Sequence, residues 1–169
     1  MIKVVGKIVN RIITLLLVLA LMLIVYIQFF QSHDPLIQFK TVLTGSMTDT
    51  YPAGSLLVIR KVEPAKLELN DVITYHVYSE VVSHRIIAKK TIGEQLYFET
   101  KGDNNQVADE MPVSAENVIG KVIASVSNLG QFFLIIQTLA GKFALILTIF
   151  QLILLDYFLK LLFTEEQTE

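Results

Sequence analysis

Residues 72–88 read VITYHVYSEVVSHRIIA, and the architecture expected for the rest of the chain follows from this stretch. Both halves are dense in β-branched and aromatic residues, which are enriched in strands. Only Ser79 and Glu80 stand between the strand-like runs 72–78 and 81–88, so the stretch predicts a β-hairpin. His84 then lies in the middle of the second strand.

The sequence on both sides of the hairpin continues the same pattern. Further runs rich in β-branched and aromatic residues cover 55–62, 95–100 and 118–126. Turn-forming residues separate these runs, at 52–54, 68–71 and 102–105. Residues 31–128 are therefore expected to form one mainly β domain, which is large enough for a single hydrophobic core.

The composition narrows the class of protein. Of the 169 residues, 53% are hydrophobic and 18% are charged, which suits a small membrane-attached protein. The formal net charge of -2 gives no reason to expect nucleic acid as a partner. The sequence has no cysteine, which excludes disulfides, cysteine nucleophiles and thiolate metal ligands. With three histidines and no HExxH pair, no metal site is expected.

The N-terminal part carries the first membrane signal. Residues 12–30 contain no charged side chain, and a helix of that length can cross about 30 Å of hydrocarbon. A cleaved signal peptide is the alternative, but its apolar region would be shorter and a small-x-small site should follow. Basic residues precede the run, which predicts a cytoplasmic segment 1–11, a retained transmembrane helix 12–30 and an extracytoplasmic domain after it.

The C-terminal third is apolar from residue 129 to 163, with Lys142, Asp156 and Lys160 as its charges. A span over 132–155 would bury Lys142 near the bilayer centre, at a cost of about 2.5–3.5 kcal/mol. A span over 143–163 leaves Lys142 at the interface, and Asp156 and Lys160, four apart on one helix face, can pair.

The second placement is therefore preferred, with a transmembrane helix over 142–163. Residues 129–141 are then expected to lie along the membrane surface, and 164–169 to form a cytoplasmic tail. The alternative is that 129–163 forms a pair of core helices of the β domain, which the length of this nearly uncharged stretch disfavours.

Three groups in the β domain have the chemistry of a hydrolytic site. Ser46 follows Gly45 near the membrane end of the domain, and a serine becomes a nucleophile only with a base in reach. His84 can serve as that base, and Asp103 or Asp109 can orient its ring. Taken singly, each is an ordinary turn or strand residue, and the sequence leaves their geometry open.

Their order along the chain resembles that of type I signal peptidases of the ER type, found in eukaryotic ER, archaea and some Gram-positive bacteria. The matching motifs, in chain order, are TGSM at 44–47, PAG at 52–54 followed by LLVI, NDVI at 70–73, SHRII at 83–87, KGDNN at 101–105 with Asp109, and IGKV at 119–122. The chain departs from the family pattern after Met47, where it has Thr-Asp in place of Glu-Pro, and at Asn70, where glycine is usual.

The resemblance implies roles for individual residues. Ser46 would be the nucleophile, His84 the general base and Asp109 the third member of a triad, with Asp103 supporting the site. The Thr44 hydroxyl and the Ser46 backbone N–H would form the oxyanion hole, and no metal or cofactor is implied.

A Ser-Lys dyad is an alternative for the base. Lys89 and Lys90 follow His84 closely in the sequence, and a desolvated lysine of lowered pKa can activate a serine.

The implied fold is a small β-sheet or barrel-like peptidase domain flanked by N- and C-terminal transmembrane helices. The implied activity is that of a membrane-bound serine endopeptidase that removes signal peptides from exported preproteins after small residues. Its partners would be these preproteins and membrane lipid, with room for other export or assembly components.

The implied location is the cell membrane, multi-pass, with the catalytic domain on the extracytoplasmic face, or the ER membrane in a eukaryote. Two other classes compete with this interpretation. One is a self-cleaving repressor of similar β architecture, which would use Ser-Lys and be soluble. The other is a membrane anchor or assembly factor without enzymatic activity, in which Ser46 and His84 would be ordinary surface residues.

Overall fold

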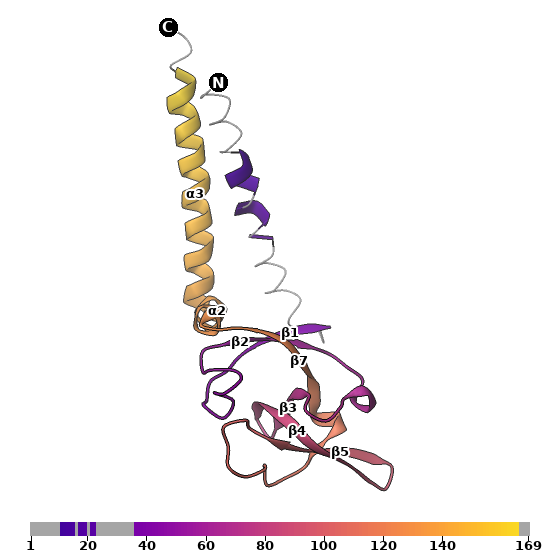
Figure 1. Cartoon of the computed structure of the whole chain (residues 1–169). Coiled ribbons are helices and arrows are strands. Elements are labelled where there is room, and N and C mark those ends of the chain that lie inside the picture. Colours follow the sequence, from indigo (N-terminus) through magenta and orange to yellow (C-terminus); the bar gives the residue numbers. More distant parts are fainter. Residues whose placement is uncertain (1–10, 16, 20, 23–35, 166–169) are drawn as a thin grey trace. The chain divides into compact units, whose positions relative to one another are not determined.

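A computed structural model describes residues 11–15, 17–19, 21–22 and 36–165, with side chains to residue 158. Its β domain is one seven-stranded sheet in the order β1-β2-β7-β3-β4-β5-β6, with antiparallel neighbours throughout (Figure 1). The strands are β1 (Ile37–Thr41), β2 (Leu56–Arg60), β3 (Val72–Val77), β4 (Glu80–Ile92), β5 (Gln95–Lys101), β6 (Val113–Ser114) and β7 (Val118–Val126). Short 3-10 turns cover Pro64–Lys66 and Ala115–Asn117. The expected mainly β domain is confirmed.

The strands follow the predicted ones with two kinds of difference. β7 has the predicted bounds, whereas β4 runs on to Ile92, and β1 and β6 were not predicted. The hairpin turn lies at Tyr78 and Ser79, one residue earlier than predicted. Tyr78 takes a left-handed backbone conformation (φ 52°), because a two-residue turn between paired strands needs positive φ.

The core lies on both faces of the central strand β3, whose first four residues are all buried. Neighbouring residues of a strand point to opposite faces, so Val72 and Ile73 enter different clusters. The first buried cluster consists of Leu67, Ile73, Tyr75, Ile86, Phe98 and Val113. The second consists of Met47, Leu57, Ile59, Val72 and Val122. Burial on both faces explains why the stretch opens with two adjacent apolar residues, Val72 and Ile73.

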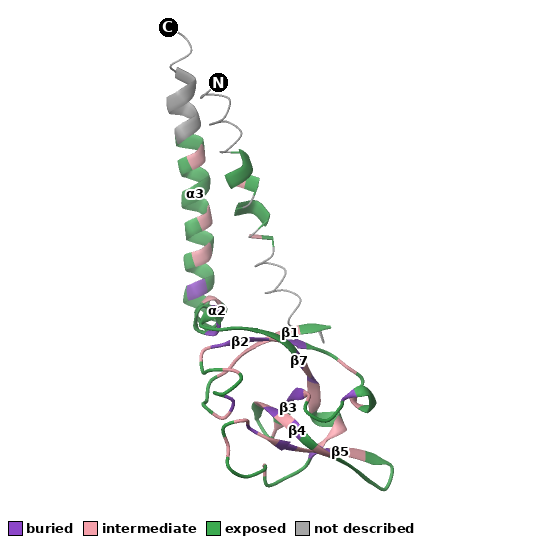
Figure 2. Ribbon diagram, viewed as in Figure 1, coloured by how far each residue is buried: buried purple, intermediate pink, exposed green. Residues whose placement is uncertain are grey.

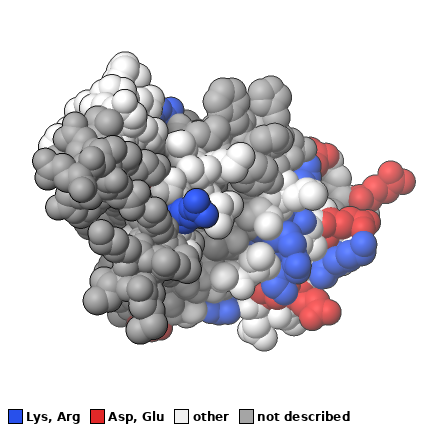
Figure 3. Space-filling view, turned by 90° about the horizontal axis from the view of Figure 1, so that it is seen from above, with Lys and Arg blue, Asp and Glu red and all other residues white. Residues whose placement is uncertain are grey.

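Charged side chains are mixed on the surface of the β domain. Figure 3 shows Lys and Arg atoms interspersed with Asp and Glu atoms on the face in view. Exposed ion pairs join Lys66 to Glu63 at 2.9 Å and Lys90 to Glu99. Pairs of this kind contribute little to stability in water, so the fold depends on its apolar clusters.

The helix α2 (Leu129–Gln137) begins directly after the sheet and is attached to it by Gly130. The Gly130 N–H donates to the Gly54 carbonyl at 2.9 Å, and the Thr41 hydroxyl donates to the Gly130 carbonyl at 3.0 Å. Phe133 is buried and its ring lies 6.0 Å from that of Phe39. The predicted apolar segment 129–141 is thus divided between α2 and the next helix.

The helix α3 (Leu139–Glu165) encloses the predicted span 142–163. Its part Leu139–Phe158 is long and apolar enough to cross a membrane, judged by length and composition. Only 6% of that window is buried, and Figure 2 shows most of its described surface as exposed. Within the described residues this disfavours a core helix. The side chain of Lys160 lies outside the described residues, so its pairing with Asp156 stays a prediction.

About half of the predicted span 12–30 lies outside the described residues. Its described residues, 12–15, 17–19 and 21–22, are helical. The remainder of that prediction, and the predicted tail 164–169 beyond residue 165, are not described by the structure. The compact β unit runs from Asp34 to Ile135, close to the predicted domain 31–128 but including most of α2.

Gly120 allows β7 to approach β2 closely. A Cβ atom at this position would lie 2.4 Å from the Arg60 carbonyl oxygen. We expect Gly120→Ala to push the two strands apart and lower the free energy of unfolding by about 2–3 kcal/mol. Thermal unfolding of the full chain in detergent, followed by circular dichroism, measures this. Ser125→Ala, at an exposed position of the same strand, is the control, and equal melting temperatures for the two variants would contradict the prediction.

Candidate active site

Ser46 lies in the loop between β1 and β2. The base of the loop is closed by a hydrogen bond from the Val42 N–H to the Ser55 carbonyl, at 2.9 Å. Inside it, the Tyr51 N–H donates to the Met47 carbonyl at 2.6 Å and forms a tight turn. The Met47 side chain is buried in the core, so the turn is anchored at the residue next to Ser46.

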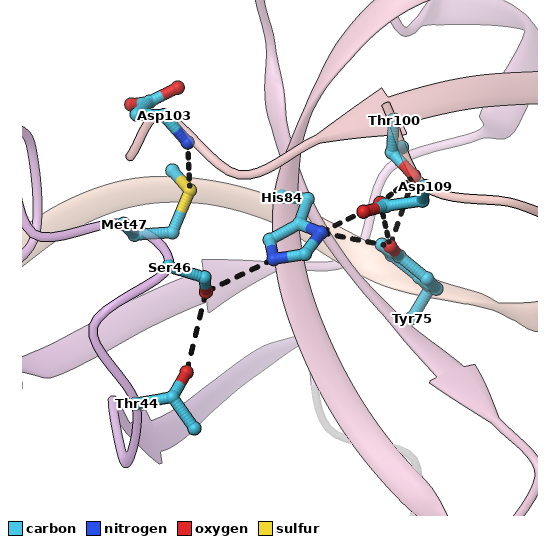
Figure 4. A network of polar contacts seen from close by, with 8 residues as sticks. All are labelled: Thr44, Ser46, Met47, Tyr75, His84, Thr100, Asp103 and Asp109. Atoms are coloured by element: carbon cyan, nitrogen blue, oxygen red, sulfur yellow. Dashed lines mark hydrogen bonds and ion pairs between the residues drawn. The ribbon is translucent and has the colours of Figure 1, made fainter. Parts of the chain in front are cut away.

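His84 lies in β4 near the open end of the β3–β4 hairpin, opposite Ile73 in the register. It shares a face of β4 with Ile86 and is only 7% exposed. Its Nε2 atom lies 3.0 Å from the Ser46 hydroxyl oxygen, within hydrogen-bonding distance (Figure 4). A rigid paired strand thus holds the imidazole at the serine on the loop.

Asp109 completes a line of three side chains. One of its carboxylate oxygens, Oδ2, lies 2.7 Å from His84 Nδ1, on the side of the ring away from Ser46 (Figure 4). Its backbone N–H donates to the Thr100 carbonyl at 2.9 Å, which ties the loop after β5 back to that strand. The hydroxyls of Thr100 and Tyr75 also contact Oδ2.

Tyr75 and Thr100 are members of this cluster that sequence reasoning missed. The hairpin pattern contains a signal for Tyr75, because residues two apart in a strand share a face and Ile73 pairs with His84. No such signal marks Thr100, since a bulge between Ile86 and Ala88 sets its register against β4.

Asp103 contacts a different partner. Arg85 binds it with two hydrogen bonds, from Nε to Oδ1 at 2.8 Å and from a terminal nitrogen to Oδ2 at 2.5 Å. The Thr50 hydroxyl also donates to Asp103. The hydrogen bond from Arg85 lowers the pKa of Asp103, and the same contact raises the pKa of Arg85. Of the two acids left open by the sequence, Asp109 contacts the imidazole and Asp103 fixes its loop.

The same acidic loop contacts the turn that contains Ser46. The Asn104 N–H donates to the Ser46 carbonyl at 2.8 Å, and its side-chain amide donates to the Gly45 carbonyl at 3.1 Å. The backbone of Gly102 passes so close that a Cβ atom there would lie 2.7 Å from the Ser46 carbonyl oxygen. The backbone of this loop therefore determines where Ser46 lies.

Thr44, the expected second member of an oxyanion hole, is exposed at the edge of the site. Its hydroxyl oxygen lies 3.3 Å from that of Ser46 (Figure 4). The Thr44 hydroxyl therefore lies directly beside the Ser46 hydroxyl.

The two lysines of the alternative dyad contact other groups. The Lys89 ammonium donates to the Leu67 carbonyl, and Lys90 pairs with Glu99. His84 holds the position next to the Ser46 hydroxyl, so the geometry favours histidine over lysine as the base. Among the described residues, no group of three or more His, Asp or Glu side chains could hold a metal ion.

The arrangement can activate a serine. An imidazole that donates from Nδ1 to a carboxylate has Nε2 free to accept the proton of a hydroxyl, which makes the oxygen nucleophilic. Burial raises the pKa of the Tyr75 hydroxyl, so it stays protonated and remains a donor beside the carboxylate.

The sequence of the chain is similar to sequences of known proteins. No protein-family model matches the chain. Over 81 residues it is 44% identical to Signal peptidase I W of Bacillus subtilis (strain 168), covering 47% of this chain and 43% of that protein. Over 99 residues it is 29% identical to the Signal peptidase complex catalytic subunit SEC11 of Colletotrichum graminicola, covering 53% of this chain and 58% of that protein.

The chain thus spans about half the length of the curated relatives that it matches. These relatives confirm the expected resemblance to type I signal peptidases of the ER type.

Gly102→Ala tests the contact between the two loops. The added methyl group would collide with the Ser46 carbonyl, so we expect the acidic loop to shift and the free energy of unfolding to fall by about 2 kcal/mol. Gly45→Ala is the matched control, because its Cβ would meet only a side-chain oxygen, at 3.2 Å. Thermal unfolding in detergent compares the two, and a larger loss for Gly45→Ala would refute the argument.

Asp103→Asn tests the ion pair with Arg85. Because the folded-state pKa of Asp103 is lowered, its charge stabilises the fold above about pH 4, and this stabilisation is lost as the pH falls through the lowered pKa. We expect the variant to be less stable than wild type by about 1–3 kcal/mol at neutral pH, with the difference shrinking in acid. Melting temperatures across pH measure it. Asp49→Asn, at an exposed position in the Ser46 loop, should show a smaller effect at neutral pH.

Proposed function

We propose that the chain is a membrane-bound serine endopeptidase that removes N-terminal signal peptides from exported preproteins after small residues. The observation that carries the proposal is the line of Ser46, His84 and Asp109, with contacts of 3.0 and 2.7 Å. The sequence similarity to a signal peptidase from Bacillus subtilis, 44% over 81 residues, supports the same substrate class.

In the proposed reaction, the Ser46 oxygen attacks the carbonyl carbon of the scissile bond while its proton passes to His84 Nε2. Asp109 holds the ring and stabilises the imidazolium that forms. The tetrahedral intermediate then collapses, the C–N bond breaks, and His84 returns the proton to the leaving amine. Water, deprotonated by His84, hydrolyses the acyl-enzyme and frees Ser46. No metal or cofactor takes part in these steps.

The oxyanion of the intermediate needs donors that are in place before the reaction. We assign this role to the Ser46 backbone N–H and the Thr44 hydroxyl, which lies 3.3 Å from the Ser46 oxygen. Two donors on one short turn keep a fixed spacing, since the next residue, Met47, is anchored in the core. Asp103 would act by holding the loop that contacts Ser46, and it touches no reacting atom.

The substrate would be presented at a membrane. The apolar helix window Leu139–Phe158 is the candidate anchor, together with the predicted span 12–30, and membrane lipid is the implied partner. The positive-inside argument puts the β domain on the extracytoplasmic side of the cell membrane, or the lumenal side of the ER in a eukaryote. The end of the signal peptide would pair as an extended strand with an edge of the sheet.

Cleavage of a preprotein by the full chain in proteoliposomes tests the proposal. We expect Ser46→Ala and His84→Ala to lower kcat by roughly a thousandfold or more, and Asp109→Ala by a comparable factor, because the three residues act as a unit. Asp103→Ala should have a milder effect. Ser79→Ala and His76→Ala, both at exposed positions of the hairpin, are matched controls that should keep wild-type rates.

Two results would change the proposal. Undiminished cleavage by Ser46→Ala would remove the enzymatic role and leave a membrane-bound β domain of the anchor or assembly class. Cleavage that survives His84→Ala but is lost on replacing Lys89 or Lys90 would transfer the base to a lysine.

A further inference from the structure

One carboxylate oxygen of the site receives three contacts from three different strands or their ends. Asp109 Oδ2 lies 2.7 Å from His84 Nδ1, 3.0 Å from the Tyr75 hydroxyl and 2.7 Å from the Thr100 hydroxyl (Figure 4). We propose that Tyr75 and Thr100 are positioning residues, whose two hydroxyls hold Asp109 as an acceptor and thereby set the tautomer of His84. The kinetic part of this inference rests on the proposed function.

Asp109 needs such support because its own segment is irregular. It follows β5 in a stretch without regular secondary structure, and its side chain is 22% exposed. Thr100 binds it twice, with its carbonyl accepting the Asp109 N–H at 2.9 Å and its hydroxyl donating to Oδ2. Both Thr100 and Tyr75 are buried in the sheet, so their donors keep fixed positions.

The number of available hydroxyl protons determines how Tyr75 and Thr100 can bond to Asp109. Tyr75 and Thr100 each carry one hydroxyl proton, and both can point at Oδ2. The Tyr75 oxygen lies 3.5 Å from His84 Nδ1, which is too long to compete with its 3.0 Å contact to Asp109. It also lies 3.0 Å from the Thr100 hydroxyl, but a carboxylate oxygen is a stronger acceptor than a hydroxyl, so both hydroxyl protons are directed at Oδ2. With two donors aimed at it, Oδ2 is an acceptor only.

The position of this acceptor determines the tautomer of His84. An acceptor at 2.7 Å from Nδ1 requires that Nδ1 carry the proton, so Nε2 presents its lone pair to Ser46. Burial raises the pKa of Tyr75, so the phenol keeps its proton and the arrangement does not invert. The tyrosine and imidazole rings also lie at a steep angle to each other, with their centroids 6.5 Å apart.

Nitrogen NMR of the full chain in detergent micelles tests the tautomer directly, because 15N shifts distinguish a protonated Nδ1 from a protonated Nε2. Histidine is labelled in a background with His33→Gln and His76→Gln, which leaves His84 as the only signal. We expect the Nδ1–H form in wild type and a mixture with the Nε2–H form in Tyr75→Phe and Thr100→Val, larger when both are combined.

Kinetics supply the second measurement. We expect Tyr75→Phe to lower kcat about tenfold with KM unchanged within about twofold, since the hydroxyl touches no substrate. Tyr97→Phe is the matched control, because its hydroxyl donates to the Gln95 side chain, outside the site, and should leave both constants unchanged. Thr100→Ser keeps a hydroxyl and should restore the tautomer and most of kcat.

The outcomes separate this inference from the proposed function. A doubly substituted protein that melts cooperatively and still has the wild-type tautomer would overturn the inference, whatever its activity. Wild-type protein that cleaves no preprotein, together with a tautomer that responds to Tyr75→Phe, would support the inference and reject the peptidase. If kcat falls in Tyr75→Phe but not in Thr100→Ser, the result supports both the inference and the proposed function.

Discussion

The hydrogen bond from the backbone N–H of Asn104 to the Ser46 carbonyl is the contact on which the site depends. It joins the loop between β1 and β2 to the loop after β5, and the glycine at 102 lets the two backbones approach. A serine on an unattached loop would sample many positions, and fixing it costs conformational entropy that this contact offsets in the folded chain. The imidazole on β4 needs no such support, since a paired strand already holds it.

The two acids of one loop are separated by the alternation of a strand. His84 and Arg85 are neighbours in β4, so their side chains leave opposite faces of the sheet. His84 meets Asp109, whereas Arg85 meets Asp103, and each acid has hydroxyl donors of its own. The ion pair between Arg85 and Asp103 orders the loop that contacts Ser46. Asp109 contacts the imidazole. One dipeptide of β4 therefore positions both ends of the acidic loop.

The helix after the sheet is attached at the base of the Ser46 loop. Gly54 accepts the Gly130 N–H and donates its own N–H to the Val42 carbonyl, within the pair of hydrogen bonds that closes the loop. Ser55 and Thr41 lie close to Gly130, so a side chain at position 130 would not fit. The backbone of Gly54 thus takes part both in anchoring α2 and in closing the Ser46 loop.

The sequence by itself determined the local features. β-branched residues and a two-residue gap predicted the hairpin of β3 and β4, although the prediction missed that Tyr75 shares a face with His84. The sequence did not predict strand β1, the short strand β6 or the position of the turn at Tyr78. These features exist only through pairing with other strands. The choice between Asp103 and Asp109 also belonged to the tertiary structure. Both acids have the same chemistry and lie in one loop, and only the folded path of that loop brings one carboxylate to 2.7 Å from the imidazole.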